Sequence, residues 1–305
     1  MLFEGRICYD ALMMDFGCRN EVSPLRRVLL KRPGSAFCTQ AAVDEQWREL
    51  HYSSPPDLMR AAEEHDVFTA TLKREGVRVE ELPEDGRTGL DSIYVRDAAL
   101  VTADGVILGR MGKSQRQSEP SAAGAFLKSL GLPVLGGIEG VGCLEGGDVI
   151  RLDGDILAVG IGYRTNREGV RQLRRLTGDR YAKIIEVPLP SWNGPCDVLH
   201  LMSLVSPVSE RSLLVHSRLL PVFFLQEMRD LGYQLIEAAE EEYASMAVNV
   251  LALAPGLCLA LSGNPLTKER LRREGITVID YDGEDLSVKG SGGPTCLTLP
   301  LHRGI

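Results

Sequence analysis

Polar side chains of the kinds that carry out hydrolysis recur along the 305-residue chain, each close to the start of an apolar, strand-like run. They are Asp91 and Asp97 in DSIYVRDAALV, Glu145 and Asp148 in CLEGGDVIRL, His200 in DVLHLMSLV, and Cys296 in SGGPTCLTL. A thiolate is a strong nucleophile, histidine can transfer protons, and carboxylates can hold a planar cation. The residue types therefore indicate covalent chemistry by a cysteine–histidine pair on a cationic substrate.

The chain has seven cysteines, an odd number with no C-x-x-C pair. This pattern argues against a disulfide framework and indicates that most of them are small buried residues. Cys296 differs from the other six because it occupies the same kind of position as the histidine and the carboxylates. We therefore expect Cys296 to be the nucleophile.

Glycines mark a repeated unit that would bring these positions together. Five of them follow a helix-like stretch and precede a strand-like run: Gly76, Gly131, Gly178, Gly232 and Gly275. Glycine is favoured just past a helix end because it adopts the left-handed conformation without a Cβ clash. A capping-box pattern, Thr165 to Glu168, predicts the start of one of these helices.

Hairpin turns precede the last four helices, at Asp104-Gly105, Asp153-Gly154, Ser209-Glu210 and Pro255-Gly256. The repeated unit is therefore strand, turn, strand, helix, strand. Five such units predict a ring of modules in which equivalent positions converge on the axis, because repeats stack to bury faces that they cannot bury alone. An ordinary doubly wound α/β sheet is the alternative architecture.

We expect one domain over residues 1–305, with an N-terminal extension at 1–19. The modules span roughly 20–90, 91–140, 141–195, 196–242 and 243–305, the first being an irregular copy. Asn20 stands at the first module's equivalent position, where it either faces the site or serves in a surface turn.

Composition excludes several classes of protein. A net charge of −8 and a pI near 5.3 argue against a nucleic-acid surface. No apolar run is long enough to span a membrane, and residues 1–20 lack a signal-peptide layout, so we expect a cytoplasmic protein. The oligomeric state is open, with a homodimer as one option.

The motifs DSIYVRD, MGKSQRQSE, LEGGD, GIGYRTN, LHLMS and GGPTCLT, taken in order, resemble the guanidino-group-modifying superfamily. Within it the sequence is most similar to the dimethylarginine dimethylaminohydrolases, from about Pro24 to Leu301. This resemblance implies a five-bladed α/β propeller (pentein) of ββαβ modules. It also implies hydrolysis of a C–N bond in arginine or a methylated arginine, which yields citrulline and an amine or ammonia.

The resemblance also implies a role for each matching residue. Cys296 matches the nucleophile, His200 the general acid and base, and Glu145 the carboxylate that orients the histidine. Asp91 and Asp97 match substrate-binding carboxylates, Asp97 holding the guanidinium, and Arg116 and Arg164 match arginines that bind the substrate's α-carboxylate. On chemical grounds Asp148 is a second candidate for holding the guanidinium. No metal or organic cofactor is needed for this reaction, and the other histidines lack metal-ligand spacing.

Other functions stay open. The arginine deiminase branch has His-x-Asp where this chain reads His200-Leu201-Met202, which favours the dimethylarginine branch. An amidinotransferase would pass the same covalent intermediate to an amine. Arginine deiminase or dihydrolase activity, agmatine deiminase activity and a non-enzymatic scaffold are further alternatives. In the plainer interpretations, His200 is a core histidine, Glu145 and Asp148 are turn residues, and Arg164 is a solvated side chain at a helix start.

Overall fold

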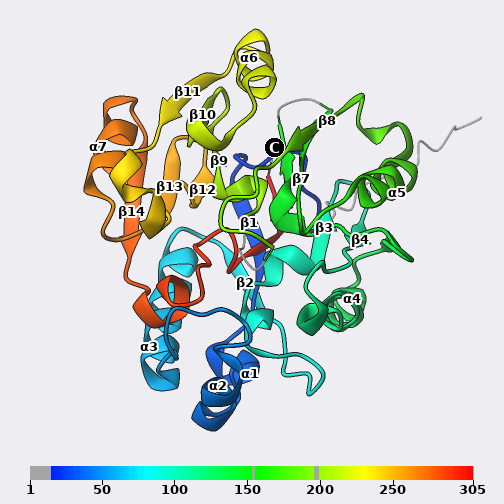
Figure 1. Ribbon diagram of the computed structural model, residues 1–305, viewed down its shortest axis with the longest axis vertical. Helices are drawn as coiled ribbons and strands as arrows, with labels where there is room; N and C mark the ends of the chain where they lie inside the picture. The colour runs from blue at the N-terminus through cyan, green and yellow to red at the C-terminus, as the bar shows by residue number, and fades with distance from the viewer. Residues whose placement is uncertain (1–14, 153–154, 196–198, 305) are drawn as a thin grey trace, which may run out of the picture.

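The computed structural model describes residues 15–152, 155–195 and 199–304. Figure 1 shows the strands gathered toward the middle of the molecule, with helices α3 to α7 on the outside. The expected N-terminal extension is described only from residue 15, and the predicted turn at Asp153-Gly154 lies outside the described residues.

Four modules follow the predicted order of strand, strand, helix and strand. They comprise β3 (Ala99–Val101), β4 (Val106–Leu108), α4 (Glu119–Ser129) and β5 (Val134–Gly137); β6 (Val149–Arg151), β7 (Ile156–Ile161), α5 (Arg167–Thr177) and β8 (Lys183–Pro188); β9 (Val205–Ser209), β10 (Ser212–Val215), α6 (Val222–Asp230) and β11 (Gln234–Glu237); and β12 (Val250–Ala254), β13 (Leu257–Leu261), α7 (Pro265–Arg273) and β14 (Thr277–Tyr281). In each, the first two strands pair antiparallel and the third pairs parallel with the second.

The remaining module combines strands from the two ends of the described chain. β15 (Leu299–Arg303) pairs antiparallel with β1 (Leu25–Leu30), and β1 pairs parallel with β2 (Arg78–Glu81). Three helices follow β1 and precede β2 in the sequence: α1 (Pro33–Ala36), α2 (Gln40–Gln46) and α3 (Leu58–Arg74). The first copy is thus irregular in sequence because its leading strand comes last. The five small repeated sheets predicted from the sequence are confirmed, each as a separate three-stranded sheet.

Local signals account for the ends of the helices. The five glycines that follow helices all have positive φ, between 53° and 84°. The capping box predicted from Thr165 is wrong by one residue: Asn166 caps α5, and its Oδ1 accepts a hydrogen bond from Gly169 N at 2.9 Å. The Thr165 hydroxyl instead accepts a hydrogen bond from the backbone N–H of Glu145 at 3.1 Å, which ties α5 to the segment that carries that carboxylate.

The apolar core consists of clusters packed between the sheets and their helices. The cluster under α3, for example, contains Phe68 and Leu72 of that helix together with Val28 of β1 and Leu259 of β13. These rigid sheets fix the direction in which the segments before β3, β6, β9, β12 and β15 enter the middle of the molecule. In the described part of the chain, no helix combines the length and apolar character needed to cross a membrane.

Candidate active site

The residues just before the five leading strands come from all five modules. Asp97 precedes β3, Glu145 and Asp148 precede or adjoin β6, His200 precedes β9, Asn249 precedes β12, and Cys296 precedes β15. Short 3₁₀ turns at Val95–Ala98, Gly146–Asp148 and Leu201–Ser203 join the first three of these segments to their strands. Such turns are tight, so each side chain near them is held at a fixed distance from its sheet.

A cavity of about 100 Å³ lies where these segments meet. Five of the eight residues predicted to form the site line it: Asp91, Asp97, Arg116, His200 and Cys296. Leu50, His51, Tyr94, Lys113 and residues 290–292 complete the lining. The structure therefore brings the predicted nucleophile, histidine and two carboxylates to one cavity, whereas Glu145, Asp148 and Arg164 are outside its lining.

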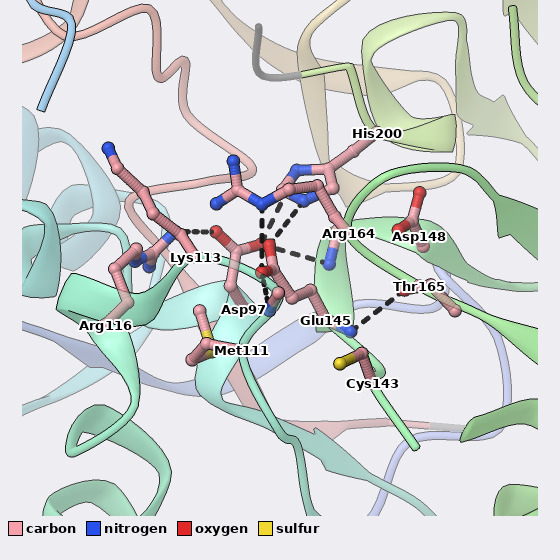
Figure 2. A network of polar contacts seen from close by, with 12 residues as sticks. Asp97, Met111, Lys113, Arg116, Cys143, Glu145, Asp148, Arg164, Thr165 and His200 are labelled. Atoms are coloured by element: carbon pink, nitrogen blue, oxygen red, sulfur yellow. Dashed lines mark hydrogen bonds and ion pairs between the residues drawn. The ribbon is translucent and has the colours of Figure 1, made fainter. Parts of the chain in front are cut away.

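Glu145 lies directly against His200 (Figure 2). The Nε2 atom of His200 is 2.7 Å from Oε2 of Glu145, and both side chains are buried. The other carboxylate oxygen, Oε1, accepts hydrogen bonds from Arg164 Nε at 3.0 Å and from Gly112 N at 2.8 Å. Arg164 therefore contacts the carboxylate behind the histidine, away from the cavity lining.

The charges around His200 favour its protonated form. Burial alone would lower the pKa of His200, but the carboxylates of Asp97, Asp148 and Glu145 raise it to about 9. Burial would likewise raise the pKa of Glu145, but Arg164 and His200 lower it well below its usual range. At neutral pH the pair is thus an imidazolium against a carboxylate.

Asp97 lies at the floor of the site between two hydrogen-bond donors. Its Oδ2 accepts a hydrogen bond from Arg116 Nη1 at 2.7 Å, and its Oδ1 accepts one from Gly147 N at 3.1 Å. The same Oδ1 is 3.8 Å from Nδ1 of His200. Asp97 is therefore fixed beside the ring nitrogen of His200 that does not contact Glu145.

Arg116 lines the cavity, but its N–H groups already have partners. Nε donates to both carboxylate oxygens of Glu119, at 2.9 and 3.1 Å, and Nη2 donates to Glu119 and to the carbonyl oxygens of Asp91 and Tyr94. Burial raises the pKa of Glu119 to about 7 against the opposing effect of Arg116. In this arrangement Arg116 donates to Asp97 with Nη1, while Glu119 accepts hydrogen bonds from its Nε and Nη2 atoms.

Asp91 pairs with a cation that is not among the predicted site residues, Lys113. Lys113 Nζ donates to Asp91 Oδ2 at 2.6 Å and to the carbonyl oxygen of Leu50 at 2.9 Å. Both side chains line the cavity. The sequence signal for Lys113 was its place in the motif MGKSQRQSE, three residues before Arg116. This spacing alone does not show which way the lysine side chain points.

Cys296 is partly buried, and its sulfur accepts a hydrogen bond from Asn249 Nδ2 at 3.2 Å. Burial raises the pKa of the Cys296 thiol and Asp97 raises it further, whereas the hydrogen bond from Asn249 lowers it. Asn249 Oδ1 in turn accepts from Thr295 N and from the Thr295 hydroxyl, at 3.0 and 2.7 Å. Asn249, also missed from the sequence, therefore positions the segment that carries the thiol.

Asp148 lies behind His200. Its Oδ1 accepts a hydrogen bond from Leu201 N at 3.0 Å, which fixes the turn that follows the histidine. Burial raises the pKa of Asp148 to about 6, and His200 opposes this effect.

Asn20 was expected either to face the site or to serve in a surface turn. It forms a turn, in which its Oδ1 accepts hydrogen bonds from Val22 N at 2.9 Å and from Ser23 N at 2.7 Å.

Among the described residues, one group of side chains lies close enough together to hold a metal ion. Ligand atoms of Asp97, Glu145 and His200 lie within 4.8 Å of one another. Each of these side chains, however, already makes a close contact: Asp97 with Arg116, and Glu145 with both His200 and Arg164. Arginine and imidazolium partners compete with a cation for these oxygens, so the arrangement suits proton transfer better than metal binding.

The sequence pattern of the arginine deiminase family matches residues 91–234 and 223–303, which include the predicted nucleophile, histidine and carboxylates. The chain belongs to the arginine deiminase family. This family member lies within the guanidino-group-modifying superfamily and close to the dimethylarginine dimethylaminohydrolases, as its motifs predicted.

Relatives of this arginine deiminase family member match most of the chain. It is 28% identical over 289 residues to YkgA, an uncharacterized protein of Bacillus subtilis strain 168, with 94% of this chain and 95% of that protein covered. It is 28% identical to the dimethylarginine dimethylaminohydrolase of Pseudomonas aeruginosa, over 80% of this chain and 89% of that enzyme. A solved structure of the latter, a cysteine-to-serine variant complexed with citrulline, has a TM-score of 0.73 at 26% identity, covering 90% of this chain and 99% of that one.

Proposed function

We propose that the protein hydrolyses the guanidinium group of arginine or an N-methylated arginine to citrulline, with Cys296 as the nucleophile. The reaction class, hydrolysis of a guanidino group in a small molecule, is supported by the family and its relatives. The observation that carries the finer proposal is the shared cavity: Cys296, His200 and Asp97 line it, and Glu145 holds His200 from behind.

The proposed reaction begins with a cation that enters beside Asp97 and Cys296. Its positive charge lowers the pKa of the buried thiol, so the thiol releases its proton to solvent and the thiolate forms in the complex. The sulfur attacks the guanidinium carbon and forms an S–C bond. Protonated His200 gives its proton to the departing nitrogen as the C–N bond breaks, which releases an amine or ammonia. An amidino-thioether on Cys296 remains.

Water completes the cycle. Neutral His200 takes a proton from water, the hydroxide adds to the amidino carbon, and the C–S bond breaks to restore the thiolate and release the ureido product. Glu145 stabilises the imidazolium form and fixes its Nε2 atom, which leaves Nδ1 on the side of Asp97. A fixed ring orientation is what makes the same atom available for both transfers.

The cavity also suits an amino-acid substrate. Asp91 and Lys113 form an ion pair at its wall. An α-ammonium group and an α-carboxylate carry the complementary charges, so we propose that Asp91 holds the former and Lys113 the latter. Arg116 and Arg164 then act as positioning residues for Asp97 and Glu145, and Asp148 supports the turn after His200. This assignment replaces substrate contact by Arg116, Arg164 and Asp148.

We also propose that the five modules form a closed five-bladed propeller that acts as one domain over residues 1–305. Pairing of β15 with β1 supports this, because it joins the last strand to the first module.

Incubation of the protein with dimethylarginine, monomethylarginine, arginine and agmatine tests the proposal. We expect citrulline from at least one amino-acid substrate, and none from that substrate with Cys296→Ser. Cys38→Ser, which changes an exposed free cysteine, is the matched control and should retain activity. Product that forms only when an amine acceptor is added would identify a transferase, and no product from any substrate would contradict the proposal.

A further inference from the structure

Three buried arginines surround one buried glutamate away from the catalytic cavity. The exposed fractions are 3% for Arg96, 1% for Arg151, 4% for Arg303 and 4% for Glu21. Arg151 Nη2 is 2.7 Å from Glu21 Oε1, and Arg96 Nη2 is 3.3 Å from Glu21 Oε2. Among the described residues, Arg303 donates hydrogen bonds to the backbone carbonyl oxygens of Ser23 and Ala252.

The charges of this cluster do not cancel. Three guanidinium groups face the carboxylate of Glu21, and this carboxylate raises the pKa of both Arg151 and Arg303. Burial lowers the pKa of Arg303 to about 10 despite the attraction of Glu21, and Arg96 and Arg151 add to the lowering. Buried positive charge in excess is unfavourable unless an anion or water compensates it.

A cavity of about 310 Å³ opens beside the cluster. Its charged lining residues are Glu21, Arg151, Glu210 and Arg211, and its polar ones include Asn20, Ser23 and Ser209. It shares no lining residue with the catalytic cavity. Arg151 lines this cavity, and within residues 15–152, 155–195 and 199–304 its buried Nε atom has no hydrogen-bond partner, so this guanidinium has one unsatisfied donor.

We propose that this second cavity binds a small oxyanion, either phosphate or the carboxylate of a small metabolite, on Arg151. A planar guanidinium recognises both kinds of oxyanion through paired N–H···O bonds. Glu21 is already neutralised by Arg96 and Arg151, so the excess positive charge of the cluster attracts the anion. Ser23 and Ser209 also line the cavity, and a serine hydroxyl can donate a hydrogen bond to an oxyanion.

Arg96 connects the cluster to the catalytic segment. Its Nε donates to the carbonyl oxygen of Thr295 at 3.3 Å, its backbone N–H donates to the carbonyl oxygen of Cys296 at 3.2 Å, and Asp97 follows it in sequence. Substitution of Arg96 would therefore disturb both cavities. Arg151 contacts only Glu21 and the carbonyl oxygen of Val101 among the contacts described, so it separates the two sites better.

Calorimetric titration of the full chain with inorganic phosphate, and separately with acetate, tests the site. We expect saturable binding of at least one anion, weakened about tenfold or more by Arg151→Gln. Arg151→Lys, which keeps the charge but loses the planar fork, should bind more weakly than the unsubstituted protein and serves if Arg151→Gln does not fold. Binding of either anion supports the site. The anion that binds more tightly indicates whether the ligand is a phosphate or a carboxylate.

Two controls keep the result specific. Arg27→Gln removes another buried arginine, paired with Glu80 at 2.9 Å and outside this cavity, and should leave anion binding unchanged. Lys113→Met removes the lysine of the catalytic cavity and should also leave it unchanged. Three results would overturn the proposal: no binding to the folded, unsubstituted protein, an affinity in both Arg151 variants equal to that of the unsubstituted protein, or loss of binding in Lys113→Met.

Discussion

His200 and Glu145 form a direct contact of 2.7 Å between Nε2 and Oε2, although 55 positions separate them in the sequence. Arg164 and the backbone N–H of Gly112 hold the other carboxylate oxygen. The glutamate is thus fixed between two cations, and the histidine ring cannot rotate without losing its main partner. This relationship determines both the charge of the ring and the nitrogen that it presents toward Asp97.

Replacement of Glu145 by glutamine should lower the pKa of His200 from about 9 toward its ordinary value of about 6.5, because the neutral amide no longer stabilises the imidazolium. The imidazole proton signal of His200, followed by NMR from pH 5 to 10, measures this change. Glu240→Gln, at an exposed ion pair with Arg218, is the control and should leave the titration unchanged.

The raised pKa of His200 also predicts how stability depends on pH. A group whose pKa is higher in the folded than in the unfolded chain stabilises the fold fully below its unfolded value and loses that effect as the pH rises through its folded value. The contribution of His200 is therefore present below about pH 6.5 and lost through about pH 9. It amounts to roughly 3 kcal/mol, since one pKa unit corresponds to about 1.4 kcal/mol. Urea unfolding of the unsubstituted protein and of His200→Gln at both ends of this range measures it, and an equal pH dependence in the two would contradict the assignment.

Asn249→Ala should make the Cys296 thiol harder to ionise, because it removes the hydrogen bond to the sulfur at 3.2 Å. We expect the pH at which Cys296 is alkylated by iodoacetamide to rise by about one unit, the scale of a single hydrogen bond to a charged group. Peptide mapping separates this cysteine from the other six. An unchanged or lower alkylation pH would show that Asn249 does not stabilise the thiolate.

Gly147→Ala should impair catalysis while the fold is kept. A Cβ atom at this position would lie 2.6 Å from His200 Nδ1 and 2.7 Å from Asp97 Oδ1, so the two side chains must separate. We expect kcat to fall about 100-fold, as for other small displacements of catalytic groups. Gly34→Ala, where the added atom meets nothing within 4 Å, is the matched control. Similar activity of the two variants would show that the spacing of His200 and Asp97 is not critical.

Lys113→Met should raise KM for arginine-type substrates by about 10- to 100-fold, with a smaller effect on kcat, because it removes the proposed partner of the α-carboxylate. The same substitution should not weaken the reaction of a guanidine that lacks a carboxylate, such as methylguanidine. Steady-state kinetics with both kinds of substrate distinguish this role from a structural one. Equal losses with both would indicate that Lys113 only supports Asp91.

The repeated fold could be predicted because its signals are local. Glycine after a helix and short turns between strands depend on neighbouring residues. The five glycines have the expected positive φ, and the predicted turns that lie within the described residues join the expected strands. The strand that leads the first module could not be predicted in this way, because it comes from the opposite end of the chain. Because β15 takes that place, Cys296 is the first module's equivalent of Asp97, and Asn249 is the equivalent in the module of β12. Asn20, the residue predicted for the first module's position, lies in a turn instead.

The site was predictable as a set of residues but not as a set of contacts. Convergence of Asp97, His200 and Cys296 follows from the repeat, whereas the partners of Arg116 and Arg164 depend on where Glu119 and Glu145 point. A buried guanidinium pairs with the nearest carboxylate, and sequence spacing does not reveal which one that is. For the same reason, the pairing of Lys113 with Asp91 emerged only from the structure.

The covalent step at Cys296 is tested most directly by rapid quenching during turnover with the best substrate, followed by mass spectrometry of the Cys296 peptide. We expect a transient mass increase on Cys296 that equals the mass of the substrate minus that of the departing amine or ammonia. This adduct should form and disappear at rates compatible with turnover. The adduct should be absent from Cys296→Ser and present in Cys38→Ser. Citrulline formed at an undiminished rate by Cys296→Ser would contradict the account.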